Sequence, residues 1–332
     1  MPEFRREPVT GRWVIVSTDR AKRPRDFTRT QVVVQRKGIC PFCPGNENRT
    51  PLEILAFRTQ GGPNEPGWST RVIPNKFPAL RVEGDFDREP EGLYDRMNGI
   101  GAHEVIIDCP EHVASLGETS DANIANVFWA FRERLGDLKN DVRLKYTILF
   151  KNHGEAAGAS LEHSHSQLIA LPIVPKTVQE ELDGSRRYFD HHERCVFCDI
   201  IRQERRDGKR VVHEDDDVIV FAPYASRFPF EMWILPRRHG SHLEFASAEI
   251  YRSLATTLGR LLRKIDRALE CPAYNFVLHN GTMKETDSPS YHWHLEIIPR
   301  LTRVAGFEWG TGFYINPTTP EEAAGFLRDT IA

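Results

Sequence analysis

The chain has few of the features that would place it in a membrane or on nucleic acid. Among its 332 residues there is no run of 18 apolar residues, and the opening Met-Pro-Glu-Phe-Arg-Arg-Glu contains no apolar core of a secretory signal. The formal net charge is −3, so a basic excess for nucleic acid is absent, and an acidic ligand must be held by local basic groups. We therefore expect a cytoplasmic protein that contacts neither nucleic acid nor membrane.

Cysteine is also scarce, yet four of the six residues form two Cys-x-x-Cys pairs, Cys40 with Cys43 and Cys195 with Cys198. In a reducing compartment such pairs favour metal ligation or redox chemistry over disulfides. The composition, 40% hydrophobic and 27% charged, is typical of a globular protein, and the length allows two ordinary domains or one large one.

A second cluster of unusual residues runs from Asn152 to Leu171, where a loop rich in glycine and alanine precedes an expected strand that begins at His163. Because side chains alternate on a strand, His163, His165 and Gln167 are predicted to share one face. The small residues upstream would let backbone N–H groups approach a phosphate. Polar residues on the solvent face of an edge strand would give the same pattern. The motifs in the rest of the chain are needed to distinguish this alternative from a ligand site.

The motifs of the first half recur in the second half in the same order. They are a Cys-x-x-Cys turn, a Lys-Phe-Pro or Arg-Phe-Pro turn, a histidine after a proline turn, an amphipathic helix (121–139 and 247–269), an asparagine, and a last strand opened by His-x-His. The histidine after the proline turn and the one that opens the last strand are 51 positions apart in the first half and 53 in the second. The asparagines, Asn152 and Asn280, precede the last histidine by 11 and 12 positions.

This recurrence predicts an α+β protein built from a duplicated unit of roughly 150 residues, too long for a solenoid repeat. We place the first domain at residues 1–174, a polar connector at 175–194 and the second domain at 195–332.

Each half supplies two thiols and two histidines, which is a tetrahedral ligand set for zinc. Four protein ligands leave no position for water or substrate, so such an ion would be structural. The predicted ligands are Cys40, Cys43, His112 and His163 in the first site, and Cys195, Cys198, His239 and His292 in the second. His103 and His242 are nearby alternatives, but His112 and His239 occupy the same place in both repeats. Ordinary thiols in turns are the competing interpretation.

If a metal holds His163, then His165 is free on the same face of the strand. An imidazole is a good nucleophile near neutral pH and a good leaving group once phosphorylated, so it can carry a nucleotidyl group between two steps. Gln167 can donate its amide N–H to a phosphoryl oxygen without adding charge. The matching residues of the second half are His294 and Glu296, and a carboxylate repels phosphate. We therefore expect one reaction centre, in the first half.

The run His163-Ser164-His165-Ser166-Gln167 resembles the galactose-1-phosphate uridylyltransferase family of the histidine-triad superfamily, over nearly the whole chain. This transferase branch has glutamine where the superfamily's hydrolases have a third histidine. The resemblance implies two tandem histidine-triad-like domains, each an antiparallel sheet with flanking helices, and a homodimer. It also implies that His165 is the nucleophile and that Gln167 contacts the phosphate.

Substrate contacts are predicted in several segments, at Arg20, Arg23, Asn75, Asn152, Ser160, Phe307 and Glu308. The resemblance assigns the paired arginines to phosphate, the residues at 152 and 160 to the α-phosphate, and the Gly-Phe-Glu segment at 306–308 to the sugar. A solvated loop is the alternative for the basic run at 19–24.

The chain departs from the family at Ser164, where proline is frequent, and at Cys195 and Cys198. Better-known members have an iron site of one glutamate and three histidines there, whereas two cysteines favour zinc. These features and Ser166 resemble the ADP-glucose phosphorylase branch.

The leading hypothesis is ping-pong uridylyl transfer from a UDP-hexose to a hexose 1-phosphate such as galactose 1-phosphate. Transfer of AMP from ADP-glucose to phosphate is the main alternative. Hydrolysis of a nucleotide and a non-enzymatic zinc and nucleotide-binding module are the remaining ones.

Overall fold

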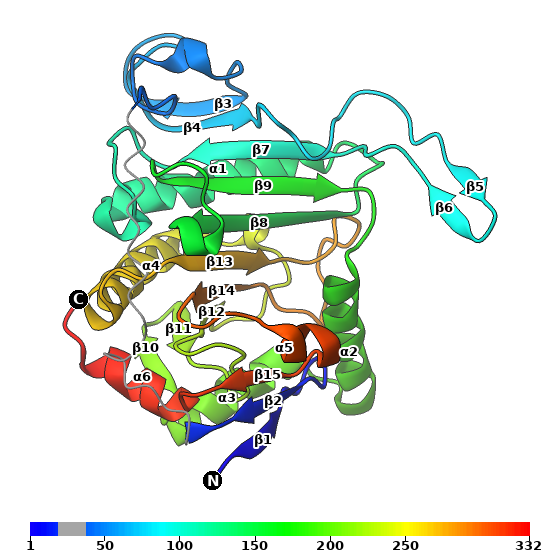
Figure 1. The fold of residues 1–332 in the computed structure, drawn as a ribbon, viewed down its shortest axis with the longest axis vertical. Helices are drawn as coiled ribbons and strands as arrows, with labels where there is room; N and C mark the ends of the chain where they lie inside the picture. Colours follow the sequence, from blue (N-terminus) through cyan, green and yellow to red (C-terminus); the bar gives the residue numbers. More distant parts are fainter. Residues whose placement is uncertain (19–37) are drawn as a thin grey trace.

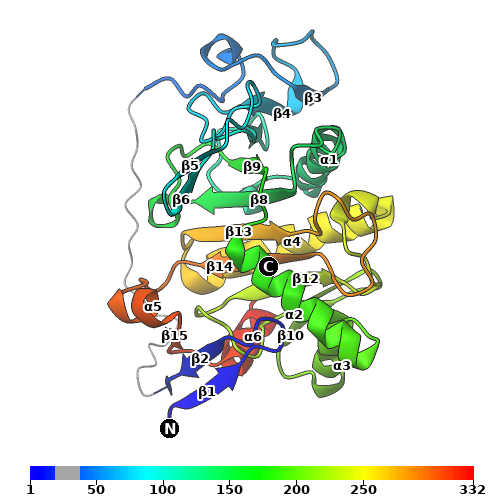
Figure 2. The same cartoon turned by 90° about the vertical axis from the view of Figure 1, so that its right-hand side faces the viewer.

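The protein is built on one continuous sheet of ten strands, all paired antiparallel (Figures 1 and 2). The computed structural model describes residues 1–18 and 38–332. In spatial order the strands are β10 (Val211–Glu214), β11 (Val218–Phe221), β12 (Met232–Pro236), β14 (His294–Pro299), β13 (Tyr274–His279), β8 (Tyr146–His153), β9 (His165–Leu171), β7 (Ala102–Ile107), β4 (Trp68–Pro74) and β3 (Leu55–Arg58).

The sheet consists of two equivalent halves that meet where β8 pairs with β13. Reading outward from this seam, β8, β9, β7, β4 and β3 correspond to β13, β14, β12, β11 and β10, and a long helix follows β7 and β12 alike. The predicted α+β duplication is therefore confirmed. The two antiparallel sheets are fused edge to edge, which removes one exposed edge from each.

The two long helices, α1 (Asp121–Leu138) and α4 (Ala248–Leu269), pack on the same face of the sheet (Figure 1). The hydroxyl of Ser120 accepts a hydrogen bond from the Asn123 N–H and so caps α1. The apolar stripes of both helices belong to one hydrophobic core that runs under both halves, and Trp129 stacks on Tyr251 across the helix pair.

Smaller elements cover the second half and the sheet ends. The helices are α2 (Lys176–His192), α3 (Val196–Asp207), α5 (Gly306–Thr311) and α6 (Pro320–Asp329), with short 3-10 turns at Glu47–Arg49, Leu116–Glu118, Glu155–Ala157 and Leu243–Phe245. A three-stranded sheet contains β1 (Glu3–Arg6), β2 (Trp13–Val16) and β15 (Tyr314–Asn316). The hairpin of β5 (Glu89–Glu91) and β6 (Tyr94–Arg96) projects from the body (Figure 1). Within the described ranges, no helix has both the length and the apolar character needed to cross a bilayer.

The segment expected as a connector forms the helix α2. Hydrophobic periodicity could not predict it, because its buried positions are Val178, Glu181, Gly184 and Ser185, of which only one is a large apolar residue. The segment therefore reads as polar, although it places Glu181 inside the protein.

Candidate active site and metal-binding groups

His165, the first residue of β9, is held in one tautomer by its own backbone. Its side chain is buried, and Nδ1 lies 2.8 Å from the carbonyl oxygen of His163. A carbonyl oxygen can only accept, so Nδ1 carries the proton and Nε2 keeps a free lone pair. Burial, together with the nearby Lys151 ammonium, lowers the pKa of His165 to about 4. The imidazole is therefore neutral at physiological pH and can act as a nucleophile.

A buried polar network fixes the other face of the same strand. Lys151 Nζ donates to Asp108 Oδ2 at 2.7 Å, to Ser164 Oγ at 2.9 Å and to the His165 carbonyl at 2.9 Å. The hydroxyls of Ser164 and Ser166 also donate to the Asp108 carboxylate. The predicted alternation is confirmed from His165 onward, where β9 begins, two residues later than predicted. The network also gives Ser164 hydrogen bonds that a proline could not make.

The sequence analysis did not identify Lys151 or Asp108. The signal that could have found them is a single charged residue next to an apolar strand run, as in Ile106-Ile107-Asp108 and Leu149-Phe150-Lys151. Charged residues at such buried positions are nearly always paired.

A cavity of about 1090 Å³ opens beside His165. It is lined by the loop at 153–163 and by Asn152, Ser160, Lys151 and residues near the first cysteine pair. Asn152 accepts a hydrogen bond from Asn275 through Oδ1 at 2.8 Å, which leaves its own N–H groups available. At Gly154 the backbone has φ +78°, and a Cβ there would meet Ala273 at 2.8 Å, so only glycine fits this turn. The cavity is thus open to a ligand at His165.

Gln167 and Asn75 are linked through His103, on the sheet face that carries His165. Gln167 Oε1 lies 2.9 Å from His103 Nε2, and Asn75 Nδ2 lies 3.1 Å from the same nitrogen. Among the described residues, none of these three lines the cavity as defined above. They form a neighbouring polar group two residues further along β9 than the nucleophile.

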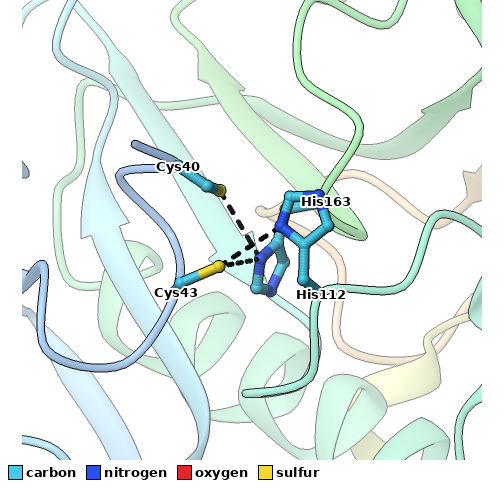
Figure 3. A group of neighbouring side chains, drawn as sticks. All are labelled: Cys40, Cys43, His112 and His163. Atoms are coloured by element: carbon cyan, nitrogen blue, oxygen red, sulfur yellow. Dashed lines mark hydrogen bonds between the residues drawn. The ribbon is translucent and has the colours of Figure 1, made fainter. Parts of the chain in front are cut away.

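The four predicted ligands of the first metal site lie together (Figure 3). Cys43 Sγ is 3.2 Å from His112 Nδ1 and 3.6 Å from His163 Nδ1, and Cys40 Sγ is 3.7 Å from His163 Nδ1. The far nitrogen of His163 donates to the Cys109 carbonyl at 2.9 Å, which directs its Nδ1 lone pair at the thiols. The group could hold one metal ion.

The second predicted set is arranged in the same way. Cys198 Sγ lies 3.5 Å from His239 Nδ1 and 3.6 Å from His292 Nδ1, and Cys195 completes the group. Here too the far ring nitrogens donate to carbonyl oxygens, those of Ser288 and Pro236. In the part of the chain that the structure describes, the alternatives His103 and His242 belong to neither group.

A third group of possible ligands, Glu181, His279 and His294, was not predicted. From the sequence, the two cysteines were expected to replace a site of glutamate and histidines, but the structure contains the Cys₂His₂ group and also a group of one glutamate and two histidines. His279 Nδ1 lies 3.1 Å from Glu181, and Glu296 forms an ion pair with Arg227. Although burial opposes it, the two carboxylates raise the pKa of His279 to about 10.

His294 is enclosed by this group. Like His165, it donates from Nδ1 to the carbonyl two residues earlier, at 3.1 Å. Its Nε2 faces Glu181 at 3.8 Å, and its ring stacks on His279 at 4.5 Å between centroids. The equivalent of His165 is therefore covered in the second half.

The remaining predicted contacts lie away from the cavity or outside the described residues. Arg20 and Arg23 lie outside the described ranges. Phe307 and Glu308 are in α5, beside β15 on the second half (Figure 1), and in the described part of the chain neither lines the cavity at His165. A carboxylate oxygen of Glu308 accepts the N–H of Ala305 and so caps α5.

Comparison with known proteins identifies the family of the chain. Models of the N-terminal and C-terminal domains of galactose-1-phosphate uridyl transferase match residues 1–175 and 181–319. The chain is 38% identical to the ADP-glucose phosphorylase of Arabidopsis thaliana, over 99% of this chain and 93% of that protein. It is 30% identical to the galactose-1-phosphate uridylyltransferase of Thermotoga maritima, with 99% of each chain covered.

Solved structures give the same result. The ADP-glucose phosphorylase from Arabidopsis thaliana with bound ADP-glucose matches with a TM-score of 0.83 and 36% identity, over 100% of both chains. A uridylyltransferase structure matches with a TM-score of 0.78 and 28% identity, over 99% of this chain and 98% of that chain.

The duplicated antiparallel sheet, with His165 at a cavity of the first half, places the chain in the class of nucleotidyltransferases built like these enzymes. The chain belongs to the galactose-1-phosphate uridylyltransferase family, and the resemblance predicted from residues 163–167 is confirmed.

Proposed function

We propose that the protein transfers a nucleotidyl group from a nucleotide sugar through a covalent intermediate on His165. Nε2 attacks the α-phosphorus, a P–N bond forms, and the P–O bond to hexose 1-phosphate breaks. A phosphate oxygen of the acceptor then attacks the same phosphorus, and the P–N bond breaks to free the imidazole. The observation that carries the proposal is the tautomer of His165, with Nδ1–H on a carbonyl and Nε2 uncovered beside a cavity.

Neutral donors and cations would stabilise the charge on the phosphate during both steps. Asn152 and Ser160 line the cavity beside His165, and the amide of Gln167 extends from the same face of β9. Preorganised donors of this kind each contribute about 10²- to 10³-fold to a rate when they meet the developing charge. We assign Arg20 and Arg23 to the same phosphate groups, because an arginine fork matches two phosphate oxygens.

The first candidate reaction uses UDP-glucose as donor and a hexose 1-phosphate, typically galactose 1-phosphate, as acceptor. Both family models and the Thermotoga maritima relative support it. A specific observation favours a second candidate, in which AMP passes from ADP-glucose to phosphate. The Arabidopsis thaliana relative with that name has higher identity, and its structure contains ADP-glucose.

We assign zinc to both Cys₂His₂ groups, in a structural role. Bonds of about 2.3 Å to sulfur and 2.0 Å to nitrogen in a tetrahedron keep these ligands about 3.5 Å apart. The sulfur-to-nitrogen distances here run from 3.2 to 3.7 Å. With four protein ligands, such an ion stabilises the segments that carry His163 and His292 and has no open position for substrate.

We also propose that the protein acts as a homodimer, in which Phe307 and Glu308 contact the sugar bound by a second copy. These residues lie away from the cavity of their own chain, and Phe307 and Trp309 are 45% and 80% exposed. A cytoplasmic location remains our expectation.

Steady-state assays with matched donor and acceptor pairs test the proposal. The purified protein is given UDP-glucose with galactose 1-phosphate in one assay and ADP-glucose with phosphate in another. Turnover in either pair, with no product when the acceptor is replaced by water alone, supports nucleotidyl transfer and names the donor. Product formed with water alone would indicate a hydrolase, and tight nucleotide binding with no turnover in any assay would indicate a binding module.

A further inference from the structure

We infer that His103 is a positioning residue that sets the orientation of the Gln167 amide. This inference rests on the proposed function, in which Gln167 donates to the phosphate. His103 is on β7 and shares a sheet face with Gln167, because Val105 is the direct cross-strand partner of Gln167 and His103 is two residues earlier. The two side chains are in contact at 2.9 Å.

The backbone of Ala79 fixes the tautomer of His103. Its N–H points at Nδ1 of the ring at 3.1 Å, and a backbone N–H can only donate. Nδ1 must therefore present a lone pair, and the ring proton of the neutral imidazole is on Nε2. The group of Gln167 that faces Nε2–H must be an acceptor, so it is the carbonyl oxygen Oε1.

Asn75 cannot accept a hydrogen bond from Nε2–H of His103. Its Oδ1 accepts the N–H of Phe77 at 2.9 Å, which turns its amide nitrogen toward His103. Because that nitrogen and Nε2–H are both donors, the 3.1 Å contact between them is not a hydrogen bond. The ring proton is left for Gln167. As a result, the NH₂ group of Gln167 points away from the ring and is free to donate to a ligand.

This restraint matters because the two ends of a glutamine amide have nearly the same shape. Without a fixed partner both orientations are populated, and in one of them Oε1 would face a phosphoryl oxygen and repel it. A histidine held by a backbone N–H selects the other orientation before substrate arrives, which is preorganisation of the donor.

The second half supports the inference with different residues at the equivalent positions. Glu296 is the cross-strand partner of Trp233, as Gln167 is of Val105, so Glu231 occupies the place of His103. Glu231 and Glu296 both contact the Arg227 guanidinium. In the first half His103 thus restrains Gln167 directly. In the second half Glu231 restrains Glu296 through the Arg227 side chain.

Single-turnover formation of the nucleotidyl adduct, with UDP-glucose and ADP-glucose tried separately, tests this role in His103→Phe. We expect the rate at saturating donor to fall about tenfold to a hundredfold, with little change in the donor concentration that gives half the maximal rate. His103→Gln, whose amide can still donate to Gln167, is expected to stay within about threefold of wild type. His213→Phe, a half-buried histidine of β10 far from the site, is the matched control and should leave the rate unchanged.

The decisive readout is the double variant with Gln167→Ala. If His103 acts through Gln167, His103→Phe has no further effect once Gln167 is alanine. Losses that multiply in the double variant, or a full rate in His103→Phe while Gln167→Ala is slow, would overturn the inference. If His103→Phe fails to fold, His103→Asn is used in its place, because its side chain is too short to reach Oε1 of Gln167. Its rate is then compared with that of His103→Gln. A full rate in Gln167→Ala would instead contradict the proposed role of Gln167.

Discussion

The two halves of the sheet have the same strands in the same order, yet in the described part of the chain the central histidine lies at a cavity in the first half and is enclosed by other side chains in the second. His165 and His294 both donate from Nδ1 to the carbonyl two residues earlier. Nε2 of His165 is free beside a cavity, whereas Nε2 of His294 faces Glu181 from α2, and the ring stacks on His279. Both histidines thus have the same hydrogen bond from Nδ1 to the backbone. We attribute a reactive role to His165 and a structural role to His294 because the groups around Nε2 differ.

The charges around the two histidines also differ. In the first half the residues beyond the nucleophile, Gln167 and His103, form a neutral pair. In the second half Glu181, Glu296, Arg227 and His279 form a buried ionic network. Neutral donors can face an anionic phosphate, whereas the carboxylates of the second network would repel it.

The largest expected effect is the loss of transfer in one half only. His165→Asn should lower the transfer rate by roughly 10⁴-fold or more, because no nucleophile remains. The matched variant His294→Asn should keep a rate within about threefold per folded molecule, although its stability falls. Transfer assays corrected for the folded fraction measure both. Equal losses in the two variants would break the distinction between the halves.

Metal removal should affect both halves equally, since both Cys₂His₂ groups have the same geometry. Cys40→Ser and Cys195→Ser are each expected to reduce the bound zinc from two ions per chain to one and to lower the midpoint of thermal unfolding. Elemental analysis and calorimetry give the two quantities. A variant that keeps both ions would remove that group from the set of metal sites.

Removing one partner from the ionic network should cost stability in the second half. Arg227→Met leaves Glu231 buried without its cation and Glu296 with His279 alone, and we expect a loss of about 3–5 kcal/mol in the free energy of unfolding. In the first half, Gln167→Ala, at the place that Glu296 has in the second, should cost about 1 kcal/mol or less while it slows transfer. Urea unfolding compares them, and similar losses of stability would show that the two halves do not differ in this way.

The smallest expected effect concerns the seam between the halves, where Asp266 of α4 faces Ser115 at 3.2 Å. Burial raises the pKa of Asp266 to about 6, above the value of about 4 in an unfolded chain. The folded state therefore binds the proton more tightly, so this stabilisation is complete below about pH 4 and is lost as the pH rises through 6.

Asp266→Asn should consequently be more stable than wild type at pH 7, by about 1–2 kcal/mol, and the difference should shrink toward pH 4. Unfolding midpoints measured for both proteins across this range test the sign. A difference that grows as the pH falls would contradict the assignment.

The residues with regular spacing could be predicted from the sequence. The duplication, the two Cys₂His₂ groups and the two long helices follow from motif order and apolar period, and the structure agrees with them. These features depend on contacts that repeat, so each half supports the prediction made for the other.

The contacts that cross between segments could not be predicted. Glu181 reaches His279 from a helix with almost no apolar period, and His103 acts on Gln167 from a different strand. Asn152 and Asn280, which recur at similar spacing in the sequence, do not occupy equivalent positions in the two halves. The strand register makes Phe150 equivalent to Val277, and Asn152 therefore corresponds to His279. A one-residue shift of this kind cannot be detected from the sequence when a longer loop follows the strand.

The most direct test of the account is the intact mass of the protein after brief exposure to UDP-glucose or to ADP-glucose, with no acceptor. We predict an adduct that acid removes, with the mass of one uridylyl or one adenylyl group, in wild type and in His294→Asn, and none in His165→Asn. An adduct that persists in His165→Asn, or no adduct on the wild-type protein with either donor, would contradict the central claim that the first half alone carries the nucleophile.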